Sequence, residues 1–111
     1  MIGGNCNAVL QIQTTSKNDF GAVSKTWQTL TTLNGFLDFI GGNASYKSNY
    51  KGKLEETTHV FICDYEDIGV EPTQCRLLIN DRVYDVLMID NPMGLNEHLE
   101  IMLKYIEVIK P

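Results

Sequence analysis

Positive charge is scarce in this sequence, which has 9 Lys and Arg against 14 Asp and Glu among its 111 residues. The formal net charge is −5 with both histidines neutral. Proteins whose main task is to hold nucleic acid depend on clustered Lys and Arg that neutralise phosphates. The composition therefore argues against a dedicated nucleic-acid-binding protein.

Long apolar runs are also missing. No segment approaches the roughly 20 apolar residues that a membrane-spanning helix needs. Residues 1–4, Met-Ile-Gly-Gly, carry neither the basic charge nor the apolar stretch of a signal peptide. We therefore expect no contact with a membrane and a chain that stays in the cytoplasm of the cell that makes it.

The cysteines do not form a disulfide pattern. Cys6, Cys63 and Cys75 are odd in number and include no C-x-x-C pair, whereas short disulfide-bonded secreted chains normally have an even number. Cys63 lies within an apolar run and Cys75 lies just before another, where a thiol is most simply a small buried hydrophobe. We expect reduced, structural cysteines.

Catalytic and cofactor motifs are lacking too. His59 and His98 have no spacing to cysteines or carboxylates that would predict a metal site. The paired glycines at 3–4 and 41–42 do not have the spacing of a phosphate-binding loop. A Cys–His nucleophilic pair stays open at this point, because such partners meet only in the fold. We expect a protein that is not an enzyme and has no cofactor or bound metal.

What is present is the composition of one ordinary globular domain. Hydrophobic residues make up 43% and charged residues 21% of the chain, and 111 residues have room for a single hydrophobic core. Short β-like runs alternate with turn signals along the chain. This pattern predicts one all-β, mainly antiparallel domain over residues 1–111, a small barrel or sandwich of about six strands.

The strand predictions differ in strength. Residues 8–13 alternate as a half-buried strand does, and residues 57–65 are rich in β-branched and aromatic side chains. Residues 76–79 and 82–89 flank Asn80-Asp81, two residues that tolerate positive φ, which predicts a tight hairpin.

Two further turns are predicted nearer the N-terminus. They lie at Asp19-Phe20-Gly21, after a polar stretch that begins at Thr14, and at Asn34-Gly35. Between them, residues 23–32 are rich in Thr, carry Trp27 and suit an exposed strand. A short strand over 35–40 follows the second turn.

The C-terminal segment, residues 95–109, is ambiguous. Its apolar residues fit a helical stripe that begins at Leu95, and Asn96 would serve as its N-cap. Residues 99–105 also alternate as in a strand. The periodicity alone favours the helix slightly.

The most informative local feature is a long polar loop over about 41–56, where the apolar periodicity disappears. Loops of this length in compact domains are usually functional or disordered. Its lysines are the one local basic cluster of an acidic chain, and its tyrosines are able to stack on bases. A solvated loop whose lysines only keep it soluble is an equally good interpretation. The candidate functional residues are Tyr46, Lys47, Tyr50, Lys51 and Lys53.

Taken in order, these landmarks resemble the phage head–tail joining family, also described as head-closure or neck proteins. The similarity covers roughly residues 8–107 and lies in the order and spacing of several segments. These are the strand ending at Gln13, Asp19 and Gly21 before Trp27, the acidic-Thr-His entry to a strand at 55–62, the hairpin at 79–86 and the apolar ending at 99–107.

The resemblance implies a structural virion protein of the neck, assembled in the bacterial host cytoplasm. Its copies would form a ring below the portal and adaptor proteins, close the DNA-filled head and offer a docking surface to tail proteins. In some members the long loop enters the channel and helps to retain DNA, so residues 41–56 would make weak, transient contact with DNA. The family ends in a strand, which favours a strand over a helix for 99–108.

Two alternative functions remain open at this stage. One is a tail-completion or tail-terminator protein, which would also be small, β-rich and ring-forming. The other, of a different class, is a module that binds a host protein through the β surface around Trp27.

Overall fold

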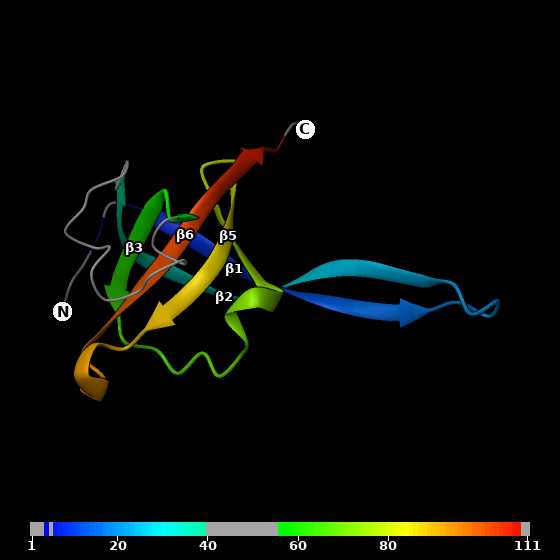
Figure 1. Ribbon diagram of the computed structural model, residues 1–111, viewed down its shortest axis with the longest axis horizontal. Coiled ribbons are helices and arrows are strands. Elements are labelled where there is room, and N and C mark those ends of the chain that lie inside the picture. The colour runs from blue at the N-terminus through cyan, green and yellow to red at the C-terminus, as the bar shows by residue number, and fades with distance from the viewer. Residues whose placement is uncertain (1–3, 5, 40–55, 110–111) are drawn as a thin grey trace.

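The computed structural model describes residues 4, 6–39 and 56–109. Six strands account for most of these residues, and one antiparallel sheet contains all of them (Figure 1). The strands are β1 Cys6–Lys17, β2 Val23–Phe39, β3 His59–Asp64, β4 Cys75–Ile79, β5 Arg82–Asp90 and β6 His98–Val108. Two short 3₁₀ turns, η2 Pro72–Gln74 and η3 Pro92–Gly94, connect β3 to β4 and β5 to β6.

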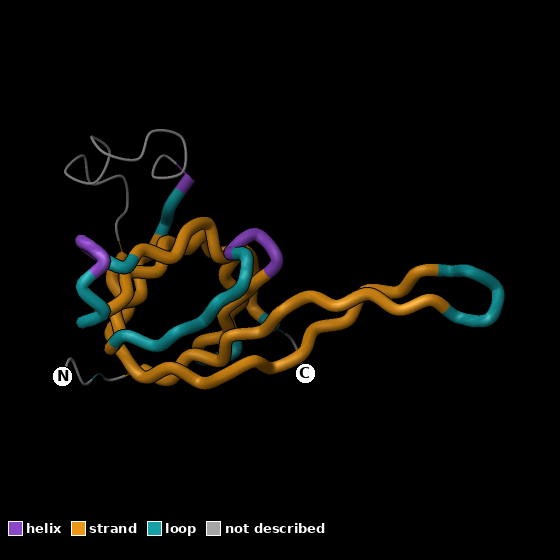
Figure 2. The backbone as a smooth tube through the Cα atoms, turned by 90° about the horizontal axis from the view of Figure 1, so that it is seen from below, coloured by secondary structure: helices purple, strands orange, loops and turns teal. Residues whose placement is uncertain are grey.

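The sheet closes into a barrel in the order β1-β2-β3-β6-β5-β4, with β4 pairing back onto β1. Closure removes the free edges that an open sheet would expose. Figure 2 shows the strands arranged around this ring. The prediction of an all-β, antiparallel fold of six strands is confirmed. In the part of the chain that the structure describes, no helix is long and apolar enough to cross a membrane.

Alternate residues of every strand fill the inside of the barrel. Each fully buried large side chain stabilises the fold by about 1.5–3 kcal/mol relative to exposure. Both Cys63 and Cys75 belong to this core, as expected, and the cysteines are free thiols. The side chains with at most 1% of their surface exposed include Ala8, Leu10, Val60, Phe61, Cys63, Leu77, Tyr84, Ile101 and Leu103.

The hairpin of β4 and β5 forms as predicted. Ile79 pairs with Arg82 across a two-residue turn, and Asn80 and Asp81 have φ angles of 51° and 65°. Asn and Asp adopt this left-handed conformation more readily than other residues that carry a Cβ.

The C-terminal segment is a strand, so the helical periodicity was misleading. β6 pairs with β3 on one side and β5 on the other. Ile101 and Leu103 belong to the barrel core, and Met102, which points to the opposite side of the strand, is only 2% exposed. Burial on both sides puts apolar residues at consecutive positions and obscures the alternation of a strand.

The predicted turn at Asn34-Gly35 is wrong, and no separate strand begins at residue 35. β2 runs through both residues, and Gly35 pairs with Cys6 of β1 and with Cys63 of β3. A Cβ on Gly35 would overlap the carbonyl oxygen of Ile62. Glycine is required here because the strands approach closely, not because the chain turns.

The polar stretch from Thr14 is also strand rather than connection, as β1 continues to Lys17. β1 pairs with β4 only as far as Ile12 opposite Cys75, and beyond it residues 13–17 pair with residues 23–27 of β2. This two-stranded hairpin, residues 13–27, is here called the arm. It projects from the barrel (Figures 1 and 2), and the molecule measures 50 × 30 × 28 Å.

Candidate interaction surfaces

The five candidate residues of the long loop, Tyr46, Lys47, Tyr50, Lys51 and Lys53, lie outside the described residues. The chain on either side of the loop is described. Phe39, the last residue of β2, pairs with His59, the first residue of β3. The loop therefore connects two neighbouring antiparallel strands at one end of the barrel.

A row of aromatic rings lies at that end of the barrel. Phe39 and His59 have ring centroids 5.2 Å apart, His59 and Tyr84 are 5.1 Å apart, and Tyr84 and Tyr105 are 5.6 Å apart. The last two pairs meet edge to face, which is a favoured arrangement of aromatic rings. The row runs across β2, β3, β5 and β6, and so it ties together the strands beside the loop.

The Thr58 hydroxyl determines which nitrogen of His59 carries the proton within this row. The Tyr105 N–H donates to Thr58 Oγ1 at 2.8 Å, and the same oxygen lies 2.8 Å from His59 Nδ1 but 3.5 Å from the Leu103 carbonyl oxygen. The single hydroxyl proton is best donated to Nδ1, which places the imidazole proton on Nε2. Burial lowers the pKa of His59, and the nearby positive charge of Arg82 lowers it further. His59 is therefore neutral at pH 7.

The buried cysteines are poor nucleophiles. Burial raises the pKa of Cys63 to about 11, helped by the negative charges of Glu66 and Asp64. Burial also raises the pKa of Cys75, whose Sγ lies 3.4 Å from the Glu71 carbonyl oxygen and donates to it. Both thiols stay protonated at pH 7, so neither supplies the thiolate that catalysis needs.

The second histidine belongs to a local pair. His98 Nε2 lies 3.0 Å from Glu100 Oε2 on β6. Among the described residues, no group of three or more His, Cys, Asp or Glu side chains is arranged to hold a metal ion.

Arg76 of β4 braces the base of the arm. Its Nε donates to Gln11 Oε1 at 2.8 Å, and its guanidinium carbon lies 4.3 Å from the ring centroid of Trp27. Burial lowers the pKa of Arg76 and Glu107 opposes this shift, but a guanidinium remains charged at neutral pH. One side chain thus connects β4, β1 and β2 where the arm leaves the barrel.

The two faces of the arm differ. On one face, hydroxyl pairs cross the strands at 2.9 Å, Thr14 with Thr26 and Ser16 with Ser24. The opposite face, by the alternation of a strand, carries Lys17 beside Val23 and Thr15 beside Lys25, with Trp27 at its base.

The tip of the arm is organised by Asn18. Its Oδ1 accepts hydrogen bonds from the backbone N–H groups of Phe20 and Ala22, both at 2.9 Å. Gly21 has a φ of 82° and closes the turn, as the sequence predicted for residues 19–21. The Phe20 side chain is 94% exposed at this tip.

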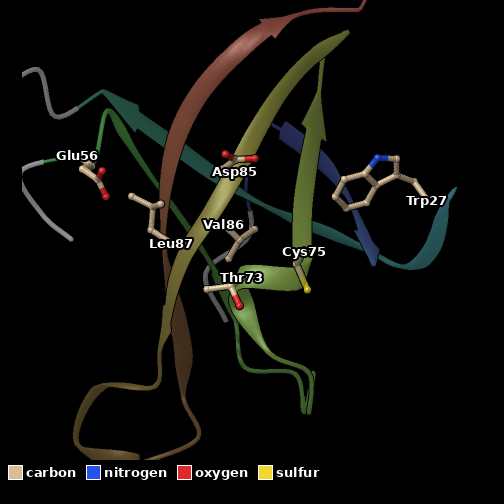
Figure 3. A pocket seen from close by; sticks show the side chains of 7 residues that line it. All are labelled: Trp27, Glu56, Thr73, Cys75, Asp85, Val86 and Leu87. Atoms are coloured by element: carbon tan, nitrogen blue, oxygen red, sulfur yellow. The ribbon is translucent and has the colours of Figure 1, made fainter. Parts of the chain in front are cut away.

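A cavity of about 300 Å³ opens on the barrel where the arm begins; we call it the arm-base groove. Figure 3 shows side chains of β5 in its middle, with Trp27 and Glu56 on opposite sides. The lining combines apolar surface with two carboxylates. Its lining residues are Trp27, Glu56, Thr73, Cys75, Asp85, Val86 and Leu87.

The sequence pattern of the phage head completion protein family matches residues 4–106. The chain belongs to this family. Solved structures of similar fold include protein SF1141 from Shigella flexneri 2a in solution, with a TM-score of 0.73, 16% identity and 93% of each chain covered. A chain in the virion of a native gene transfer agent particle aligns with a TM-score of 0.59 and 15% identity over 96% of each chain. No curated protein matches the sequence.

Membership of the head completion family confirms the resemblance inferred from the order of the sequence landmarks. It supports a structural role in completing the phage head, in contact with other phage structural proteins. The two solved structures, both below 20% identity, show the shared fold. The arm is the feature that the sequence interpretation missed. Its one sequence signal is the run of β-branched and hydroxyl residues on either side of the turn at 19–21.

Proposed function

We propose that this protein forms a ring below the portal and its adaptor proteins, closes the DNA-filled phage head and provides the surface on which the tail docks. The observation that carries the proposal is the family match over residues 4–106 on a closed six-stranded barrel. A barrel of this size has its own core and needs no partner in order to fold, which suits a subunit that is added to a preassembled head. The role is structural and not catalytic.

The long loop over 41–56 lines or gates the channel of this ring. Two observations support this part of the proposal. The strands that the loop connects, β2 and β3, bring its two ends to the same end of the barrel. Lys47, Lys51 and Lys53 are three of the 9 basic residues of the chain, within seven positions of one another.

The charge of the described barrel suits a channel through which DNA passes. Outside the arm, the described residues include twelve Asp or Glu and three Lys or Arg. Such a surface repels phosphates, so DNA slides past it without being held. The loop lysines would supply weak contacts that fall with rising salt.

Deleting residues 42–53 tests the loop. We expect a folded protein, because the six described strands lie outside the deleted range, but heads that leak DNA or fail to join tails. A matched variant, Lys47→Ala with Lys51→Ala and Lys53→Ala, keeps the length and removes the charge. DNA retention in purified heads and phage titre are the measurements. A normal titre from the deletion would remove the gating role.

Co-purification tests the position of the ring. The proposal predicts that the tagged protein is recovered with heads that contain the portal when tail genes are inactivated. Recovery with tails made without heads would instead indicate a tail-completion or terminator protein.

A further inference from the structure

Among the strands that the structure describes, none outside the arm pairs with its outer part. Residues 15–17 of β1 pair with residues 23–25 of β2, and the other described strands pair with neither set. A two-stranded ribbon alone in water is marginally stable. Here it is fixed at its base by Arg76 and at its tip by Asn18, so the tip is presented at a defined distance from the barrel.

The chemistry of the arm is opposite to that of the barrel. Residues 13–27 include two lysines and one aspartate, whereas the other described residues carry twelve acidic and three basic side chains. The tip adds apolar surface, with Phe20 94% and Val23 57% exposed. Lys17 lies beside Val23 in the register of the arm, so positive charge and apolar surface share one face. This combination fits a surface that is both apolar and acidic.

The arm-base groove has this chemistry. Leu87 and Trp27 provide apolar surface, and Asp85 and Glu56 provide carboxylates around a cavity of about 300 Å³ (Figure 3). Val86 also lines the cavity but belongs to the barrel core and is only 2% exposed. That volume accommodates an aromatic ring. The groove is thus complementary to the tip in both charge and apolar character.

The tip of the same molecule does not reach this groove. Phe20 is seven positions before Trp27 along the chain, and a strand rises about 3.3 Å per residue, which places the tip roughly 20 Å away. Figure 1 shows the arm directed away from the barrel. An occupant with the chemistry of the tip therefore has to come from another molecule.

We propose that the arm of one copy docks in the arm-base groove of the next copy, with Phe20 on the apolar lining and Lys17 and Lys25 facing the carboxylates of Asp85 and Glu56. Donor and acceptor surfaces are different, so the contact is head-to-tail and closes into a ring when the rotation between copies permits. The inference rests on the proposed function in that a ring is the assembly it would build. The bracing of the arm lowers the ordering cost of docking.

Photo-crosslinking from the tip tests the contact directly. Phe20 is replaced by p-benzoylphenylalanine, and light and isotopically heavy copies are mixed before irradiation. We expect crosslinks between position 20 of one copy and residues 73–87 of another, found as mixed light–heavy peptides. The same probe at Met93, which is 92% exposed, is the control and should not label residues 73–87.

Crosslinking is carried out in two settings, in virus particles that contain the protein and in concentrated purified protein. The proposal is overturned if position 20 crosslinks to a different protein or to another surface of the neighbouring copy. It is also overturned if position 20 forms no crosslink in either setting. Head joining is measured separately. If heads are joined to tails but the copy-to-copy crosslink is not found, the docking is wrong and the proposed function stands. If the crosslink forms but the protein is absent from heads, the proposed function is wrong and the docking stands.

A charge exchange gives a second test. Variant one carries Lys17→Glu and Lys25→Glu, and variant two carries Asp85→Lys and Glu56→Lys, each with the probe at position 20 and each checked for folding by circular dichroism. We expect either variant alone to lose roughly tenfold of the crosslink yield, since like charges then face each other. Mixing the two should restore the yield between a variant-one arm and a variant-two groove. Equal yields in all samples would overturn the assignment of the lysines to the groove carboxylates.

Discussion

His59 shows how a single residue couples the barrel to pH. The Thr58 hydroxyl donates to Nδ1 of the neutral ring, and the aromatic rings of Phe39 and Tyr84 pack against the imidazole, so its surroundings favour the neutral form. Burial and the charge of Arg82 lower the pKa of His59 from 6.5. The unfolded chain therefore binds a proton more readily than the folded protein does.

This difference predicts a pH-dependent stability. The contribution of His59 is complete above pH 6.5 and is lost as the pH falls from there through the lowered pKa of the folded protein. The free energy of unfolding from urea titrations should decrease between pH 7.5 and 5.5, and His59→Gln should flatten this slope. His98→Gln is the control. In this variant the decrease in the free energy of unfolding that His59 causes should remain. An unchanged slope in His59→Gln would contradict the assignment.

Gly35 is a second residue whose role is specific. An added Cβ meets the Ile62 carbonyl oxygen and presses on the Phe61 ring, and both belong to a strand that cannot move without disturbing the core. We expect Gly35→Ala to destabilise the protein by about 2–3 kcal/mol, as overpacking does. At Gly21 an added Cβ meets nothing within 4 Å, and only its φ of 82° opposes alanine. Gly21→Ala should therefore cost about 1 kcal/mol, and equal losses in chemical denaturation would contradict this distinction.

Among the elements, the most accurate predictions were those based on a sequence signal that has only one structural explanation. The hairpin of β4 and β5 was predicted because Asn80 and Asp81 both suit positive φ. The Asn34-Gly35 signal failed because glycine serves two purposes, turning and close approach, and only the fold shows which applies. β6 was ambiguous because Met102 is buried on the side where a half-exposed strand would carry a polar residue.

The arm could not be predicted from hydrophobic periodicity, because neither of its faces belongs to the core. Thr14, Ser16, Ser24 and Thr26 pair through hydroxyl groups on one face, and the other face is largely polar. A polar strand and a polar connection have the same hydrophobic pattern. For the same reason the candidate residues of the loop were chosen by composition, and their role in the channel stays a prediction.

Arg76 decides how firmly the arm is joined to the barrel. Arg76→Ala removes both the hydrogen bond to Gln11 and the stacking on Trp27, and we expect a loss of about 1–2 kcal/mol. Amide exchange should accelerate in residues 13–27 but not in β3 or β6. Trp27 is the single tryptophan, so its fluorescence reports the change without interference. Arg76→Lys keeps the charge but lacks the planar guanidinium group, so it should restore only part of the protection of these amides from exchange. Faster amide exchange throughout the barrel in Arg76→Ala would contradict a local role.

At the scale of the whole molecule, the barrel and the arm are separable. The buried core residues lie in the barrel, and no residue between 14 and 26 is among them. A barrel without the arm should therefore fold, while the assembly that we propose should not form.

Replacing residues 14–26 by Asn-Gly tests this separation. Gln13 and Trp27 already face each other across the ribbon, so a two-residue turn joins them with the register kept. We expect a melting temperature within a few degrees of the full protein, because the core is intact, and loss of the copy-to-copy contact and of head joining. The deletion of residues 42–53 is the matched control, since it should keep that contact and impair DNA retention instead. Sedimentation of concentrated protein and the yield of joined heads separate the two variants, and normal head joining by the armless barrel would show that the ring is held by other surfaces.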